Sequence, residues 1–262
     1  MSEMVRRILV SVSAVFMVLG TLYGFGVIGE RVEESSGGAF AADATLVTPA
    51  SPAFSVWSLI YLGLFAYVVW QWLPASRASG RADRIWWLAA VSMVLNGAWL
   101  LVTQVGWIWV SVAVIAALAL TLGTLVARLS EKPAPGLPEW VLVDGVFGIY
   151  LGWVSVATIA NVTAALVASG VNPPLEQGQY WAVGVLALGA ALGVWLAVRL
   201  GGRIAVAAAM AWAMCWIAVG RLTATPSSTL VGVAALVAAA VIVAAAVIAR
   251  LRRPARPMRA IS

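Results

Sequence analysis

The sequence has no histidine and only one cysteine, Cys215, which lies within an apolar run. Without His, the chain lacks the usual ligands of catalytic zinc and haem iron and the usual group of a proton relay. A single Cys cannot form an intramolecular disulfide, and within an apolar run it is typically a small packing residue. These absences argue against His-dependent enzymes and zinc sites, and we assign Cys215 no functional role.

Charge is also scarce, since charged residues make up 10% of the 262 residues and apolar residues 63%, with 14 Trp among them. A water-soluble domain of this length needs a charged surface that this chain does not have. The composition therefore predicts an all-α integral membrane protein whose apolar faces contact the lipid bilayer.

Polar residues divide the chain into eight apolar runs, each about long enough for the roughly 20 residues of a membrane-spanning helix. The expected spans are 7–28, 53–73, 85–104, 107–128, 140–167, 180–200, 203–220 and 228–250. Only QVGW separates the third run from the fourth, which leaves open one re-entrant excursion there. The fifth run is long enough to tilt or to begin with an interfacial turn. We favour a retained first helix over a cleaved signal peptide, because the apolar stretch is too long and four charges lie between it and the AFA at 39–41.

The basic residues predict the orientation. With the N-terminus in the cytoplasm, 14 of the 16 Arg and Lys fall inside, and only Arg31 and Arg221 fall outside. The inside residues are Arg6, Arg7, Arg77, Arg81, Arg84, Arg128, Lys132, Arg199, Arg203, Arg250, Arg252, Arg253, Arg256 and Arg259. We therefore expect both termini in the cytoplasm. The bias toward Arg, Ala and Val is typical of a GC-rich bacterial genome, which favours the inner membrane as the location.

The C-terminal arginines predict a basic cytoplasmic tail at 251–262, positioned to meet anionic lipid headgroups rather than nucleic acid. Asp144 is expected near the cytoplasmic interface, either hydrated or paired with an arginine. Arg221 is expected to snorkel toward the outer surface. Tryptophans at the span ends are expected to form interfacial belts; they are Trp70, Trp72, Trp86, Trp87, Trp107, Trp109, Trp140 and Trp181.

Three of the spans carry stripes of aromatic and polar residues at helical spacing. The stripes are Trp57, Tyr61, Val68 and Trp72 in the second span, Asn96, Trp99 and Thr103 in the third, and Tyr150, Trp153, Ala157 and Asn161 in the fifth. An amide facing lipid would leave its hydrogen-bonding groups unpaired, so Asn96 and Asn161 should point into the bundle. There they either contact a ligand or bond a neighbouring helix, a contribution of about 0.6 kcal/mol on average.

Glycine pairs of the GxxxG type favour close helix contacts. Gly148 and Gly152 lie on a different side of the fifth span from its aromatic stripe, and 20–24 and 189–193 carry the same spacing.

Three motifs, FSVWSLIY at 54–61, LNGAW at 95–99 and YLGWVSVATIAN at 150–161, fall in order on the second, third and fifth spans. Together they resemble the TspO/MBR family, the tryptophan-rich sensory proteins that include the translocator protein or peripheral benzodiazepine receptor. The resemblance covers about residues 7–167. It implies a five-helix bundle over 1–170. The three additional transmembrane helices expected over 171–250 have no counterpart in the short family members.

The resemblance also implies a ligand. Family members bind tetrapyrroles such as protoporphyrin IX and haem in a pocket lined by indoles and amides, and they often form homodimers. The matching ligand-binding residues here are Trp57, Tyr61, Asn96, Trp99, Tyr150, Trp153, Ala157 and Asn161. Some members promote light-dependent porphyrin breakdown, which Trp57 and Trp153 would permit. No obligatory cofactor or metal is implied.

Stacking aromatics with a few orienting amides also suit a flat aromatic ligand on chemical grounds. The leading hypothesis is therefore a tryptophan-rich membrane receptor or sensor for a tetrapyrrole or a similar apolar aromatic molecule. A multi-pass small-molecule transporter and a structural membrane partner without a ligand are the alternatives.

Overall fold

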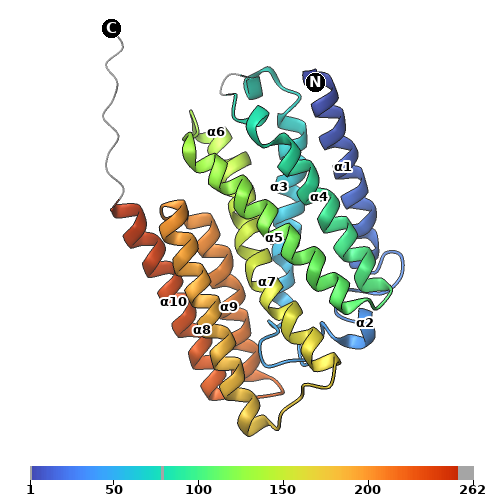
Figure 1. Ribbon diagram of the computed structural model, residues 1–262, viewed down its shortest axis with the longest axis vertical. Helices are drawn as coiled ribbons and strands as arrows, with labels where there is room; N and C mark the ends of the chain where they lie inside the picture. Colours follow the sequence, from blue (N-terminus) through green and yellow to red (C-terminus); the bar gives the residue numbers. More distant parts are fainter. Residues whose placement is uncertain (1, 78–79, 253–262) are drawn as a thin grey trace.

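The structure is a computed structural model that describes residues 2–77 and 80–252 (Figure 1). Within these residues, eight helical segments are long and apolar enough to cross a membrane, which confirms the predicted all-α multi-pass fold. The main helices are α1 (Glu3–Gly24), α3 (Val56–Trp70), α4 (Ala82–Gln104), α5 (Ile108–Glu131), α7 (Val146–Ala168), α8 (Leu175–Leu200), α9 (Ile204–Thr223) and α10 (Thr229–Leu251). The shorter segments are α2 (Ser35–Gly38), η1 (Ser51–Ser55), η2 (Pro74–Arg77), α6 (Leu137–Glu139) and the π turn η3 (Trp140–Gly145).

The helix ends follow local sequence signals. The side chains of Ser2 and Ser228 accept hydrogen bonds from backbone N–H groups in the first turns of α1 and α10. Gly106, with φ +72°, lies in the turn between α4 and α5, so the third and fourth apolar runs are two separate helices and not one re-entrant excursion. The long fifth run, 140–167, begins with the π turn, which corresponds to the additional first turn that its length allowed as an alternative to tilt.

The helices pack side by side in a defined order (Figure 1). Helix α1 packs on α4, α4 on α5, α5 on α7, α7 on α9, α9 on α10 and α10 on α8, while α3 contacts α1 and α7. One hydrophobic core extends from α1 through to α10. The start of α1 and the end of α10 lie at the same end of the molecule, as an even number of spans requires.

The five-helix part of the chain contacts the three additional helices where α7 packs against α9. A Cβ atom added at Gly152 would lie 2.3 Å from the carbonyl oxygen of Val206, and one at Gly148 would lie 2.8 Å from the Cβ of Ala205. The GxxxG pair of the fifth span therefore makes the close helix contact that its spacing favours, and its partner is α9, the second of the additional helices.

We expect Gly152→Ala to destabilise the protein by about 1–3 kcal/mol, because the new methyl group meets backbone that must move. The measurement is thermal or denaturant unfolding in detergent micelles. The matched control is Gly123→Ala in α5, where no atom lies within 4 Å of an added Cβ. The control should gain up to about 1 kcal/mol from helix propensity. Equal effects of the two substitutions would contradict close packing at α7 and α9.

A buried ion cluster joins the two parts at the end of the molecule where the termini lie. Asp144 Oδ1 accepts hydrogen bonds from Arg81 at 2.8 Å and from Arg203, just before α9, at 2.6 Å. Arg81 also binds Glu139 at 2.9 Å. Burial lowers the pKa of Arg81, but its bonds to Asp144 and Glu139 and their negative charges outweigh this effect, so its pKa lies above the ordinary value. The arginine pairing expected for Asp144 is confirmed, whereas the burial of Glu139 was not foreseen.

We expect Asp144→Asn to cost about 3–5 kcal/mol of stability, because it leaves two arginines beside a neutral amide in a buried setting. Asp83→Asn removes one partner of a more exposed pair with Arg6 and should change stability by about 0–1 kcal/mol. Unfolding midpoints of both variants at the same pH and salt provide the comparison. If the Asp144 variant were as stable as the Asp83 variant, the cluster would not hold the two parts together.

Three expectations about single residues are wrong. Trp70 is only 5% exposed and packs in the core, so it is not a belt residue, although Trp72, Trp87, Trp107, Trp109, Trp140 and Trp181 are exposed. Arg221 does not snorkel, because it is 1% exposed and bonds to carbonyl oxygens inside the protein. Cys215 is exposed on α9 and is not a packing residue. The basic tail at 251–262 lies outside the described residues beyond Arg252.

Candidate ligand pocket

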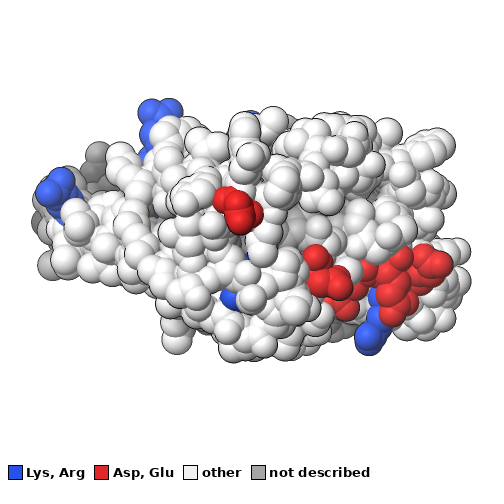
Figure 2. Space-filling model, turned by 90° about the horizontal axis from the view of Figure 1, so that it is seen from below, with Lys and Arg blue, Asp and Glu red and all other residues white. Residues whose placement is uncertain are grey.

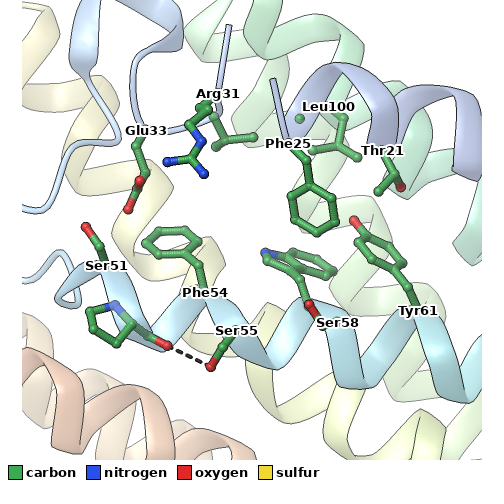
Figure 3. A pocket seen from close by; sticks show the side chains of 14 residues that line it. Thr21, Phe25, Arg31, Glu33, Ser51, Phe54, Ser55, Ser58, Tyr61 and Leu100 are labelled. Atoms are coloured by element: carbon green, nitrogen blue, oxygen red, sulfur yellow. Dashed lines mark hydrogen bonds between the residues drawn. The ribbon is translucent and has the colours of Figure 1, made fainter. Parts of the chain in front are cut away.

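A pocket of about 330 Å³ lies at the end opposite the termini (Figure 3). Its walls come from the end of α1, the segment before α2, the η1 turn, the start of α3 and Leu100 of α4. The lining residues are Thr21, Gly24, Phe25, Arg31, Val32, Glu33, Ser51, Pro52, Phe54, Ser55, Trp57, Ser58, Tyr61 and Leu100. Segments far apart in sequence therefore meet at the mouth of the second span.

The chain enters α3 through a 3₁₀ turn with Pro52 near its start. Proline suits this position because its fixed φ matches the first turn and its missing N–H leaves no donor unpaired. The Ser55 hydroxyl donates to the Pro52 carbonyl oxygen at 2.7 Å, shown as a dashed line in Figure 3. This turn leads directly into Trp57 and Tyr61, which lie one helical turn apart and line the pocket.

Trp57 is the centre of an aromatic cluster beneath this pocket. Its ring stacks on Tyr61, with centroids 5.4 Å apart and planes at 14°, and on Trp99 at 6.4 Å. The rings of Tyr150 and Trp153 meet it edge-on at 6.2 Å and 6.0 Å. Offset stacking and edge contacts are the favoured arrangements of aromatic pairs. The predicted stripes of three helices thus converge on one indole.

The two amides are largely engaged within the protein. Asn161 Oδ1 accepts from Trp99 Nε1 at 2.8 Å, and Asn161 Nδ2 donates to the Ser111 hydroxyl at 3.0 Å. Asn96 Oδ1 accepts from the Tyr61 hydroxyl at 3.1 Å, while its buried Nδ2 has no hydrogen-bond partner. Tyr150 donates to the carbonyl oxygen of Ser92 at 3.2 Å. Of the two roles considered for the amides, bonding of neighbouring helices engages both the oxygen and the nitrogen of Asn161 but only the oxygen of Asn96.

A second, smaller cavity of about 40 Å³ lies deeper, between the loop before α3 and α7. Trp99, Trp153, Ala157 and Asn161 line it, and Phe54 lines both this cavity and the pocket. Phe54 packs edge-on against Trp153 at 5.7 Å and therefore forms part of the wall between them. The buried Nε1 of Trp153 has no partner, which is unusual for an indole in a packed interior.

The structure thus brings all eight predicted site residues into one region, but they do not all line the same cavity. Trp57 and Tyr61 line the pocket, whereas the small cavity is lined by Trp99, Trp153, Ala157 and Asn161. Asn96 and Tyr150 line neither, although both are fully buried beside the cluster. Sequence reasoning missed three lining residues. Phe25 directly follows α1 and has no motif around it, and Arg31 and Glu33 belong to a loop whose charge was its only sequence signal.

The loop between α1 and α3 covers the pocket and is fastened on two sides. On the α4 side, Gln104 Nε2 donates to the Glu30 carbonyl oxygen at 3.0 Å, and the Ser36 hydroxyl donates to the Thr103 carbonyl oxygen at 2.8 Å. On the α9 side, Arg221 donates to the Ala42 carbonyl oxygen at 2.9 Å, and Trp212 Nε1 to that of Ala53 at 3.0 Å. The additional helices therefore hold one side of the pocket cover.

The same end of the molecule has an acidic surface. In the view from below, Asp and Glu side chains gather toward one side, with few basic groups among them (Figure 2). Glu30, Glu34 and Asp43 are exposed acids of the covering loop.

These features define a multi-pass membrane protein with an aromatic pocket beneath a loop between its first two spans. A family model described as TSPO-like protein matches residues 7–248. The chain belongs to this family, and the match extends through the three additional helices, beyond the region in which the motifs were recognised. Comparisons with curated proteins and with solved structures find no match.

We expect Arg221→Met to loosen the covering loop, because the variant loses the guanidinium bonds to Ala42 and Pro226. Bonds to charged groups contribute about 1.5–3 kcal/mol, so amide exchange over residues 39–50 should rise roughly tenfold or more. Hydrogen exchange followed by mass spectrometry measures this. Arg199→Met, which removes an exposed arginine of α8, is the control and should leave the loop unchanged. Identical exchange in the two variants would contradict the role of α9 in holding the cover.

Proposed function

We propose that this protein is a membrane receptor or sensor that binds a tetrapyrrole, or a similar flat aromatic molecule, in the pocket above Trp57. The observation that carries the proposal is the position of this indole. It lies in the pocket lining, where Tyr61 stacks on it, and Trp99 and Trp153 pack against it from the interior of the protein. A rigid aromatic surface at the floor of a concave site favours stacking of a flat conjugated ligand.

The size of the site indicates how such a ligand enters. The pocket, at about 330 Å³, is at the lower end of the range typical for small-molecule sites. It accommodates one edge of a tetrapyrrole, and deeper insertion requires Phe54 to leave the wall beside Trp153. In that deeper position the unpartnered Nε1 of Trp153 could donate to an acceptor on the ligand. We therefore propose that Trp57 binds first and that the deeper indole and amide layer contributes after Phe54 moves.

The lining favours a metal-free porphyrin over haem. It contains no Met or Cys, and the chain has no His, so the residues that commonly ligate haem iron are missing from the pocket. The Tyr61 hydroxyl is a lining oxygen, but it already donates to Asn96. Protoporphyrin IX is accordingly the ligand that we propose to test.

A receptor is better supported than a transporter. Directly below Trp57, the α3 side chains Ile60, Leu64 and Tyr67 are at most 1% exposed and pack in the core. A polar pathway along α3 would need this packing to open.

With the termini in the cytoplasm of a bacterial cell, the pocket would open on the outer side of the inner membrane.

The test is titration of the purified protein with protoporphyrin IX, followed by the porphyrin absorption band and by Trp fluorescence. We expect saturable binding that is weakened about fivefold in Trp57→Phe, because the smaller ring loses roughly 1 kcal/mol of stacking.

Trp195→Phe is the matched control, since Trp195 is 55% exposed on α8 and lines neither the pocket nor the deeper cavity. Its affinity for protoporphyrin IX should equal that of the unaltered protein. Binding that is absent, or that is affected equally by the two substitutions, would refute the pocket as the binding site.

A further inference from the structure

Three of the seven polar side chains that line the pocket already donate hydrogen bonds within the protein. The Thr21 hydroxyl donates to the Met17 carbonyl oxygen at 2.8 Å, and Ser55 and Tyr61 donate as described above. The amides of the deeper layer are also engaged, Asn161 through its oxygen and its nitrogen and Asn96 through its oxygen. None of these groups carries a positive charge, so a carboxylate of a ligand must find its countercharge elsewhere in the lining.

The remaining polar side chains of the lining are the neutral hydroxyls of Ser51 and Ser58 and two charged loop residues. Arg31 is the only cation among the pocket-lining residues, and its guanidinium makes no ion pair or hydrogen bond within the part of the chain that the structure describes. Glu33 Oε1 is buried and has no hydrogen-bond partner there either. Figure 3 shows both side chains reaching toward the pocket from the side opposite Phe54.

The backbone holds Arg31 in this position. Residues Phe25 and Arg31 form an antiparallel bridge, closed by a turn in which Gly26 has φ +71° and Gly29 has φ +83°. The Val32 N–H donates to the Gly24 carbonyl oxygen at 3.0 Å. Arg31 is thus presented from a fixed turn and not from a free loop, which reduces the entropy lost when it binds a partner.

We propose that Arg31 is the specificity-determining residue of the pocket, and that it binds a carboxylate at the edge of the ligand while the ring stacks on Trp57. A guanidinium forms strong, paired hydrogen bonds with a carboxylate. Arg31 is exposed at the mouth of the pocket, so the attraction depends on the paired geometry of these bonds and weakens with added salt. The proposal deepens the proposed function and rests on it.

Glu33 is expected to oppose the binding of a second acidic group of the ligand. Its carboxylate lies in the same lining and repels a second acidic group, so it opposes any pose that places both acids of a dicarboxylic ligand in the pocket. The two loop charges should therefore act in opposite senses on an acidic ligand. Neither should affect a ligand of the same shape whose acids are esterified.

The experiment compares protoporphyrin IX with its dimethyl ester, which has the same ring but no carboxylates. Binding of each is measured to the full-length protein in detergent micelles, for the unaltered chain and for the Arg31→Gln, Glu33→Gln and Glu34→Gln variants. Glu34 is an exposed neighbour outside the pocket lining, so its substitution changes the loop charge as much as that of Glu33.

We expect the unaltered protein to prefer the acid over the ester by roughly tenfold. Arg31→Gln should abolish this preference by weakening acid binding alone. Glu33→Gln should strengthen acid binding by about two- to threefold, whereas Glu34→Gln should have little effect.

The outcomes separate the two proposals. If Arg31→Gln weakens both ligands equally, or weakens neither, the role of Arg31 is overturned while the binding function stands. If the Glu34 variant matches the Glu33 variant, general loop charge and not the pocket residue is responsible. If the unaltered protein binds neither ligand, both this inference and the proposed function are overturned.

Discussion

Polar groups within a bilayer must find partners inside the protein, because lipid offers none, and this requirement organises the whole molecule. It places Asp144 between Arg81 and Arg203, where one carboxylate oxygen links the first part of the chain to the helices that follow. The same requirement sets Arg221 against loop carbonyl oxygens and Asn161 between Trp99 and Ser111. Each of these bonds joins elements that are distant in sequence, so together they determine how the helices are arranged.

The exceptions to this rule are informative because several lie near the pocket. Among the described residues, Trp153 Nε1, Asn96 Nδ2 and Glu33 Oε1 are buried without hydrogen-bond partners, and two of these residues line the cavities described above. Under the proposed function, a bound ligand would supply partners to such groups. The additional helices contribute at a distance, since α9 packs on the glycines of α7 and also holds the cover.

Sequence reasoning succeeded where the physical signal is local. The eight spans follow from run length, and the convergence of Trp57, Trp99 and Trp153 follows from helical spacing combined with the cost of placing amides in lipid. It failed where burial depends on another segment. Trp70 has the sequence signature of a belt residue, yet Tyr67 and the core surround it. Arg221 was placed at the surface because nothing in its own helix indicates that the loop carbonyl oxygen of Ala42 lies beside it.

The sequence by itself determined that this is an eight-span membrane protein, which helices carry aromatic stripes, and where glycine pairs allow close packing. These properties depend on hydrophobic length and on a helical period that every short segment carries. Only the tertiary structure decided that Asn161 is already engaged, that Phe54 separates two cavities, and that Arg31 enters the pocket from a loop. Those properties depend on which atoms of distant segments come within hydrogen-bonding or van der Waals distance, and helix packing sets that choice.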